Sequence, residues 1–200
     1  MRRLMVSEFI TLDGVVEAPG GEPGHPNTSW VFDYHGPELE RYKLREIREA
    51  GSMLLGRVTY EGFAEAWPPR QGEIAEVLNS MPKHVVSSTL TAPLAWSNST
   101  LLTGDLRTAI TDLKQGDGGP ILVHGSATLS RGLLDAGLVD DLRLMIFPVL
   151  VGGGRGIFPA SFGKSTFTLV ESETVLPNVV ALTFRLADAK PALGEKQRDS

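Results

Sequence analysis

Two segments of the sequence place glycine beside hydroxyl-bearing or cationic residues, where a buried strand is expected to lead into a helix. They are LGRVTY at 55–60 and VHGSAT at 123–128. The first turn of a helix has backbone amides without intrahelical partners, and the helix dipole favours an anion there. Glycine lets an anion approach the backbone, and the Arg57 guanidinium can bind a phosphate through two hydrogen bonds. Both segments therefore predict phosphate sites, with an ordinary turn capped by Thr59 or Ser126 as the alternative.

A third polar patch, Ser87-Ser88-Thr89, follows another expected strand. Open α/β sheets bind ligands beyond the carboxyl ends of their strands. Three strand ends with glycine, hydroxyls and arginine indicate a ligand with several phosphates, so a nucleotide site is the hypothesis. The cluster GGGRG at 152–156 does not open a helix after a strand, and we interpret it as a turn.

Several other chemistries lack the residues they need. The chain has no cysteine, which excludes disulfides, a thiol nucleophile and a thiolate zinc site and fits a reducing cytosol. Its four histidines lie far apart in sequence and form no metal-type pair with a carboxylate, so we expect no metal site. Neither a P-loop lysine motif nor a serine elbow is present.

Charge and hydropathy limit the kinds of binding partner that we expect. Lysine and arginine total 19 against 24 acidic residues, a net charge of -5, so we expect neither nucleic acid nor an anionic membrane as a partner. The longest apolar stretch, 144–151, is far shorter than the roughly twenty residues of a membrane helix. Glu8 and Asp13 interrupt the N-terminal apolar run before a signal peptide could form. We expect a cytoplasmic protein.

Strands and helices alternate along most of the chain. Periodicity predicts strands at 4–12, 52–55, 83–87, 100–102, 121–124 and 141–151. Helices are expected from Pro37 to Gly51 and over 60–66 and 73–79. Two more are expected, one capped by Thr103 or Asp105 and the other by Ser126. The last two strands, 166–174 and 178–186, have the pattern of an antiparallel hairpin. This order predicts a single α/β domain with a mixed, mainly parallel sheet.

The segment 17–37 is a long loop rich in glycine and proline that also contains Trp30, Phe32 and Tyr34. We interpret it as a lid or binding loop, with a surface insertion as the alternative.

Taken in order, the motifs resemble the dihydrofolate reductase-like superfamily. The similarity is strongest to the C-terminal reductase domain of bacterial riboflavin biosynthesis enzymes. The segments that carry it are Thr11-Leu12-Asp13-Gly14, LLGRVTYEGF at 54–63, KHVVSS at 83–88, residues 121–158, and NVVALTFR at 178–185.

The resemblance implies a sheet of about eight strands in a domain over 1–187, a polar tail at 188–200, and NADPH as hydride donor. The implied phosphate contacts are Gly56, Arg57 and Thr59, with Arg57 near the 2′-phosphate. Ser87, Ser88 and Thr89 would follow the adenosine half. The pyrophosphate would contact Gly125, Ser126, Ala127 and Thr128. The turn from Leu12 through Asp13 to Gly14 would border the nicotinamide.

The sequence departs from the family in two places. Ser126 stands where the family commonly has a second glycine. The carboxylate that folate reductases carry on the helix before the Gly-Arg strand has no clear match, which disfavours a folate reductase. Candidates for proton delivery are Asp13, Asp33, Glu40 or a bound water. Candidates for the walls of an acceptor pocket are Trp30, Phe32, Tyr34, Phe63 and Trp67.

The sequence is therefore interpreted as an NADPH-dependent reductase acting on a small heterocyclic or carbonyl/imine acceptor. One alternative is the 5-amino-6-(5-phosphoribosylamino)uracil reductase of riboflavin biosynthesis, whose ribose phosphate would need further basic groups such as Arg155 or Lys164. Another is a catalytically silent nucleotide-binding module. A homodimer is expected because closed dimers are the commonest oligomers.

Overall fold

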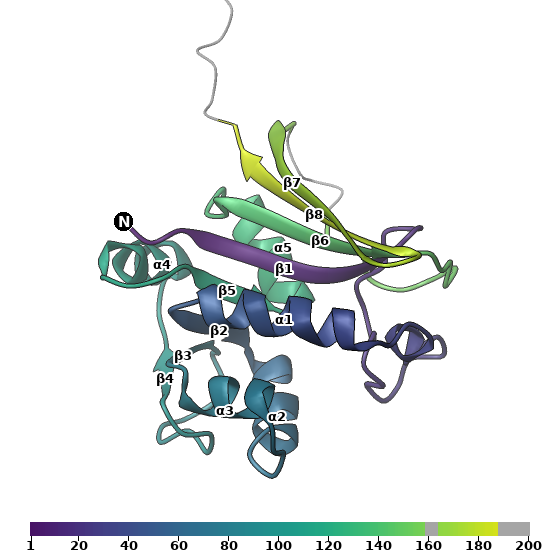
Figure 1. Cartoon of the computed structure of the whole chain (residues 1–200). Helices are drawn as coiled ribbons and strands as arrows, with labels where there is room; N and C mark the ends of the chain where they lie inside the picture. The colour runs from purple at the N-terminus through teal and green to yellow at the C-terminus, as the bar shows by residue number, and fades with distance from the viewer. Residues whose placement is uncertain (159–163, 188–200) are drawn as a thin grey trace, which may run out of the picture.

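One eight-stranded sheet organises the chain (Figure 1). The computed structural model describes residues 1–158 and 164–187, so the predicted tail at 188–200 lies outside the described residues. The strand order is β4-β3-β2-β5-β1-β6-β8-β7. The parallel strands are β1 (Leu4–Thr11), β2 (Ser52–Gly56), β3 (Lys83–Val86), β4 (Ser99–Leu102), β5 (Ile121–His124) and β6 (Asp141–Phe147). A hairpin of β7 (Phe167–Leu176) and β8 (Val179–Leu186) pairs antiparallel with β6, so the predicted mixed sheet is confirmed.

Helices cover both faces of this sheet, because its central strands are apolar on both sides. One face packs against α1 (Pro37–Glu49), α2 (Arg57–Ala66) and α3 (Glu73–Ser80), and the other against α4 (Leu106–Gln115) and α5 (Ala127–Asp135). Figure 1 shows α1 and α5 on opposite sides of β1. Alternate residues of β1 divide between the two cores, with Met5 on the α1 face and Val6 on the α5 face.

Two polar residues interrupt the apolar run of β1. Ser7 and Glu8 are 4 % and 2 % exposed. Glu8 accepts a hydrogen bond of 2.7 Å from the Ser130 hydroxyl of α5. Burial in this apolar core raises the pKa of Glu8 to about 8, so the carboxyl group keeps its proton at neutral pH.

Two element boundaries differ from the prediction. Helix α2 begins at Arg57, not near residue 60, because Gly56 is extended and serves as its N-cap. Arg57 and Thr59 therefore lie in the first helical turn. The predicted strand over 141–151 ends at Phe147, because Pro148 has no amide to donate to a sheet ladder.

The long loop folds onto the end of β6. It contains a 3-10 helix, η1 (Trp30–Asp33), whose Trp30 ring lies edge-on to Phe147 at 5.5 Å between centroids. The Tyr34 hydroxyl donates to the Pro148 carbonyl at 3.1 Å. The loop is thereby packed against the sheet and is not a free insertion. None of the helices in residues 1–158 and 164–187 has the length and apolar content to cross a membrane.

Candidate cofactor and acceptor site

The predicted cofactor residues lie along one edge of the sheet. Strands β3, β2, β5 and β1 are consecutive neighbours in the sheet and parallel, so their carboxyl ends lie side by side. They lead into the four candidate segments, which are 87–89, 56–59, 125–128 and 12–14. The sheet topology therefore brings together residues that are more than a hundred positions apart in sequence.

Hydrogen bonds join the two strand-to-helix junctions directly. The Gly56 amide donates to Ser126 Oγ at 3.1 Å, and Thr59 Oγ1 donates to the Gly125 carbonyl at 3.0 Å. Gly125 has a φ of +64°, a left-handed conformation that favours glycine. The N-termini of α2 and α5 are thus held beside each other at one point of the sheet edge.

Ser126 has a different role from the predicted helix cap. It occupies the N-cap position of α5, but its side chain makes no capping hydrogen bond. Its hydroxyl oxygen instead accepts a hydrogen bond from the Gly56 amide. Helix α2 also begins without a side-chain cap. The first-turn amides of both helices therefore lack side-chain partners, which is the arrangement that an anion completes.

One guanidinium lies beside each of these helix starts. Arg57 is in the first turn of α2 and is 2.8 Å from the Glu61 carboxylate, with both side chains 46 % exposed. Arg155, from the glycine-rich turn, hydrogen-bonds to Thr128 Oγ1 in the first turn of α5 and lies 3.6 Å from Glu17. Two cationic groups and two uncapped helix starts thus converge on the same edge.

The other two candidate segments are turns held by their own side chains. Ser87 Oγ accepts from the amides of Thr89 and Leu90 at 3.1 and 3.0 Å. In the turn after β1, Asp13 accepts from the Gly152 amide at 2.8 Å and from Thr11 Oγ1. The Thr11 hydroxyl and the backbone amides hold the pKa of Asp13 below its ordinary value. Asp13 is therefore a carboxylate that fixes two turns together and is poorly suited to donate a proton.

The three acidic candidates for proton delivery are not assembled into one group. Asp33 and Glu40 are exposed, on η1 and α1 respectively. Among the described residues, no hydrogen bond or ion pair joins either of them to Asp13.

Sequence reasoning missed a polar cluster on the α1 face of the sheet. Ser7, His124 and Arg143 are register partners on β1, β5 and β6, so their side chains lie in a row on one face. Lys43 and Glu46 of α1 lie over this row. We name these five residues the Lys43 cluster.

Glu46 is at the centre of the Lys43 cluster and is 1 % exposed. Its carboxylate binds Lys43 Nζ, accepts from Ser7 Oγ at 2.6 Å, and lies 3.4 Å from Arg143 Nη1. Burial opposes ionisation, but the Lys43 charge together with the hydrogen bonds from Lys43 and Ser7 holds the pKa of Glu46 below its ordinary value. The cluster therefore contains a buried carboxylate with cations on two sides.

His124 is the neutral member of the cluster and the one that faces outward. Its Nδ1 is 3.3 Å from Lys43 Nζ, and its side chain is 20 % exposed. Burial, and next the Lys43 charge, lower the pKa of His124 to about 3. The rings of Phe9 and Phe63 flank the imidazole, with centroids at 6.1 and 6.0 Å.

Only Phe63 among the five predicted pocket aromatics packs against the Lys43 cluster. Trp30 is buried and Tyr34 packs on the same Phe147 ring, at 5.6 Å. Phe32 is 61 % exposed, and Trp67 stacks under Arg70 at 4.7 Å. Trp30 and Tyr34 therefore anchor the loop to the core.

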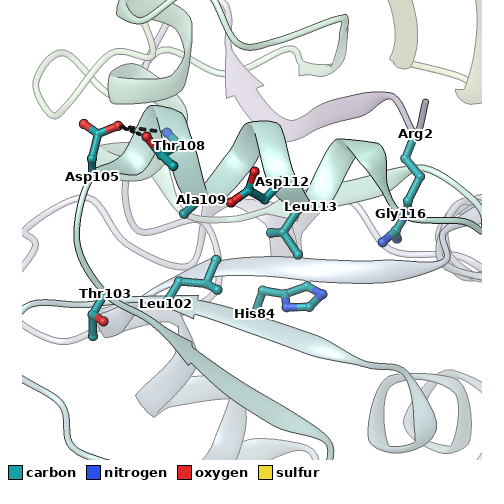
Figure 2. A pocket seen from close by; sticks show the side chains of 10 residues that line it. All are labelled: Arg2, His84, Leu102, Thr103, Asp105, Thr108, Ala109, Asp112, Leu113 and Gly116. Atoms are coloured by element: carbon teal, nitrogen blue, oxygen red, sulfur yellow. Dashed lines mark hydrogen bonds between the residues drawn. The ribbon is translucent and has the colours of Figure 1, made fainter.

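One groove lies elsewhere, between α4 and strands β3 and β4, with a volume of about 590 Å³. Figure 2 shows His84 and Leu102 facing Ala109 and Leu113 across it. None of the predicted cofactor or acceptor residues lines this groove. A smaller hollow of about 350 Å³ lies between the long loop and the glycine-rich turn at 151–154. It lies next to the Gly152 amide, which donates a hydrogen bond to Asp13.

Comparison with known families agrees with this architecture. The family described as RibD C-terminal domain matches residues 2–181. The chain belongs to the RibD C-terminal domain family. The predicted resemblance to the riboflavin-type branch of the dihydrofolate reductase-like fold is confirmed.

Individual relatives of this RibD C-terminal domain are distant. YyaP of Bacillus subtilis (strain 168) is 24 % identical over 189 residues, which are 92 % of this chain and 94 % of YyaP. A Shewanella sp. PV-4 protein assigned to riboflavin biosynthesis superposes with a TM-score of 0.72 at 23 % identity, over 92 % of this chain and 99 % of that one. Enterococcus faecalis dihydrofolate reductase in complex with NADP(H) gives a TM-score of 0.60 at 15 % identity, over 93 % and 97 %. At these identities the solved structures establish the fold.

Proposed function

We propose that this RibD C-terminal domain is an NADPH-dependent reductase that transfers a hydride to a small heterocyclic or carbonyl/imine acceptor. The observation that carries the proposal is the pair of uncapped helix starts, joined through Ser126 and Thr59, with a guanidinium beside each. This arrangement fits a dinucleotide with a pyrophosphate and a further phosphate, because each anion meets first-turn amides and one arginine. The E. faecalis reductase, which has the same fold, is a complex with NADP(H).

Each candidate segment has a place in this proposal. Arg57 would bind the 2′-phosphate, the 125–128 turn the pyrophosphate, and the 87–89 turn the adenosine half. The exposed turn from Leu12 to Gly14 would border the nicotinamide. When bound, NADPH supplies the hydride, while the chain orients the ring at the end of β5 and excludes water from it.

The family favours one more specific acceptor, the ribosylaminopyrimidine of riboflavin biosynthesis. That acceptor carries a ribose phosphate and needs a cation of its own. Arg155, one of the two basic candidates, is already bound to Glu17 and Thr128 beside α5, where it would serve the cofactor. We therefore propose an acceptor without a phosphate, and keep the aminopyrimidine as the second candidate.

We also propose that two copies pair. Strand β7 is at the edge of the sheet and exposes Leu169 and Val170 at 52 % and 45 %. An exposed apolar edge strand is a template for pairing with a second copy. Light scattering at micromolar concentration should give twice the chain mass of 21.6 kDa, and a monomer mass would contradict the proposal.

Titration of the cofactor tests the main proposal. NADPH should bind more tightly than NADH, and Arg57→Ala should weaken NADPH by about 10- to 100-fold while leaving NADH unchanged, since one charge-assisted contact is lost. Arg41→Ala is the matched control, because Arg41 is also exposed and paired within its helix, with Glu38 at 2.9 Å. Equal and negligible binding of both nucleotides would contradict the proposal. Binding without NADPH oxidation by any pteridine, pyrimidine or quinone would favour the silent module.

A further inference from the structure

The proposed reduction needs a proton as well as a hydride, and the acidic candidates do not supply one. Asp13 is held as a carboxylate by the hydroxyl and amides around it. Asp33 and Glu40 are exposed, and within residues 1–158 and 164–187 their side chains join no hydrogen bond or ion pair that reaches the strand ends. The Lys43 cluster, in contrast, lies at the carboxyl end of β5 and is partly open to solvent.

The contact between Lys43 and His124 fixes the imidazole tautomer. An ammonium group can only donate hydrogen bonds, so His124 Nδ1, 3.3 Å from Lys43 Nζ, must be an acceptor. A neutral imidazole with an accepting Nδ1 carries its proton on Nε2. Among the described residues none hydrogen-bonds Nε2, so within this part of the chain the Nε2–H group is available to a bound acceptor.

The cluster fixes the position of the Lys43 ammonium. Glu46 binds the ammonium, and the Ser7 hydroxyl lies 3.4 Å from the same nitrogen. Ser7 and Arg143 in turn bind the Glu46 carboxylate at 2.6 and 3.4 Å. The three donors of the ammonium are thereby directed to the carboxylate, the hydroxyl and the imidazole.

The position of His124 suits a group that touches the acceptor. It is the last residue of β5 and directly precedes Gly125, the start of the turn proposed for the pyrophosphate. Phe9 and Phe63 flank it on the α1 face of the sheet. An aromatic acceptor packed against these rings would lie beside the imidazole.

We propose that His124 and Lys43 form the proton-delivery pair of this enzyme, with His124 Nε2–H bound to the nitrogen or oxygen of the acceptor's C=N or C=O group. This inference rests on the proposed function. With NADPH bound, a C–H bond of the dihydronicotinamide would break, its hydride would form the new C–H bond at the acceptor carbon, and NADPH would become NADP+. The π electrons of the double bond would move to the nitrogen or oxygen. That atom takes the proton from Nε2, while Nδ1 takes one from Lys43 Nζ. The resulting neutral amine is reprotonated from solvent, and the imidazole then returns to its first tautomer.

In this pair His124 is the catalytic residue, and Lys43 is a positioning and proton-supplying residue behind it. Glu46 and Arg143 are the other charged groups that face the imidazole or its partner. Glu46 holds the ammonium in place through an ion pair, and the ammonium polarises the imidazole so that Nε2–H is a stronger donor.

The first test is independent of activity. Nitrogen-15 NMR of the full-length chain should show His124 as the neutral Nε2–H tautomer at about pH 7. Lys43→Met should raise the pKa of His124 by more than about one pH unit and mix the tautomers, since the cation is removed while Glu46 remains. Lys43→Arg should preserve the wild-type tautomer. An Nδ1–H tautomer or an imidazolium in the wild type would overturn the proposal.

The second test follows single-turnover NADPH oxidation with 6-methyl-7,8-dihydropterin as the acceptor. His124→Leu should slow the step by at least about 100-fold, and His124→Gln, which keeps an N–H donor without the relay, by about 10-fold. The NADPH Kd should change by less than about twofold in both variants, which separates lost proton delivery from misfolding. A wild-type rate in His124→Leu would overturn the proposed proton-delivery pair and would leave the proposed reductase function unaffected. A wild type that binds NADPH but oxidises it with no pteridine, pyrimidine or quinone would overturn the proposed function itself.

Discussion

Glu8 makes the stability of the protein depend on pH in a direction opposite to that of most carboxylates. It is 2 % exposed in the core between β1 and α5, and burial raises its pKa from 4.5 to about 8. The folded chain therefore binds a proton that the unfolded chain releases between these two values. The stability contributed by Glu8 is present in full below about pH 4.5 and is lost as the pH rises to about 8.

The size of this effect follows from the two pKa values. Each pH unit between them is worth about 1.4 kcal/mol when the group is ionised only in the unfolded chain. Between about pH 5 and pH 7 the wild type should therefore lose about 2 to 3 kcal/mol of unfolding free energy through this one group. Glu8→Gln should remove this slope, because the neutral amide keeps an oxygen for the Ser130 hydroxyl and does not titrate.

Urea unfolding of both proteins at the two pH values measures the difference. We expect the stability of Glu8→Gln relative to wild type to improve by about 2 to 3 kcal/mol from pH 5 to pH 7. Glu40→Gln, at an exposed position of α1, should keep the wild-type slope. Parallel pH profiles for wild type and Glu8→Gln would refute the assignment of a buried, protonated Glu8.

Two further predictions concern packing and charge. Glu46→Gln should destabilise the fold by about 3 kcal/mol in urea unfolding, since it leaves the half-buried Lys43 ammonium without its carboxylate, and a loss below about 1 kcal/mol would contradict a buried ion pair. Gly51→Ala should lower the melting temperature, because the added Cβ would lie 2.6 Å from the backbone nitrogen of Gly119. Gly62→Ala, in α2 with open space around the added Cβ, should instead gain up to about 1 kcal/mol from helix propensity, and equal melting temperatures for the two alanine variants would contradict the reasoning.

The elements that the sequence predicted best are those with a strong local signal. Alternation of buried strands with glycine- or proline-bounded helices located β1 to β5 within a residue or two. Asp105 caps α4 as predicted, with its carboxylate accepting from the Thr108 amide at 2.8 Å. The prediction placed the end of β6 too late because apolar residues continue past Pro148. The apolar composition suggested a longer strand, although Pro148 has no amide to donate to the sheet.

The predicted cofactor residues could be located from the sequence, whereas the Lys43 cluster could not. Gly56 and Gly125 follow recognisable strands, so their junctions could be predicted one by one. The Lys43 cluster could not, because charged helix residues are normally solvated and nothing local shows that Lys43 and Glu46 face the sheet. Its one signal in the sequence was His124, a polar residue at the end of an apolar strand. The partners of His124 depend on the strand register that sets it beside Ser7, which the sequence does not show.

A crystal structure with NADPH tests the central claim most directly. The account predicts the 2′-phosphate at Arg57, the pyrophosphate on the first-turn amides at 125–128, and the nicotinamide ring beside His124. Density for the dinucleotide in the groove between α4 and β3, or helix starts that stay covered by side chains when NADPH is present, would contradict it.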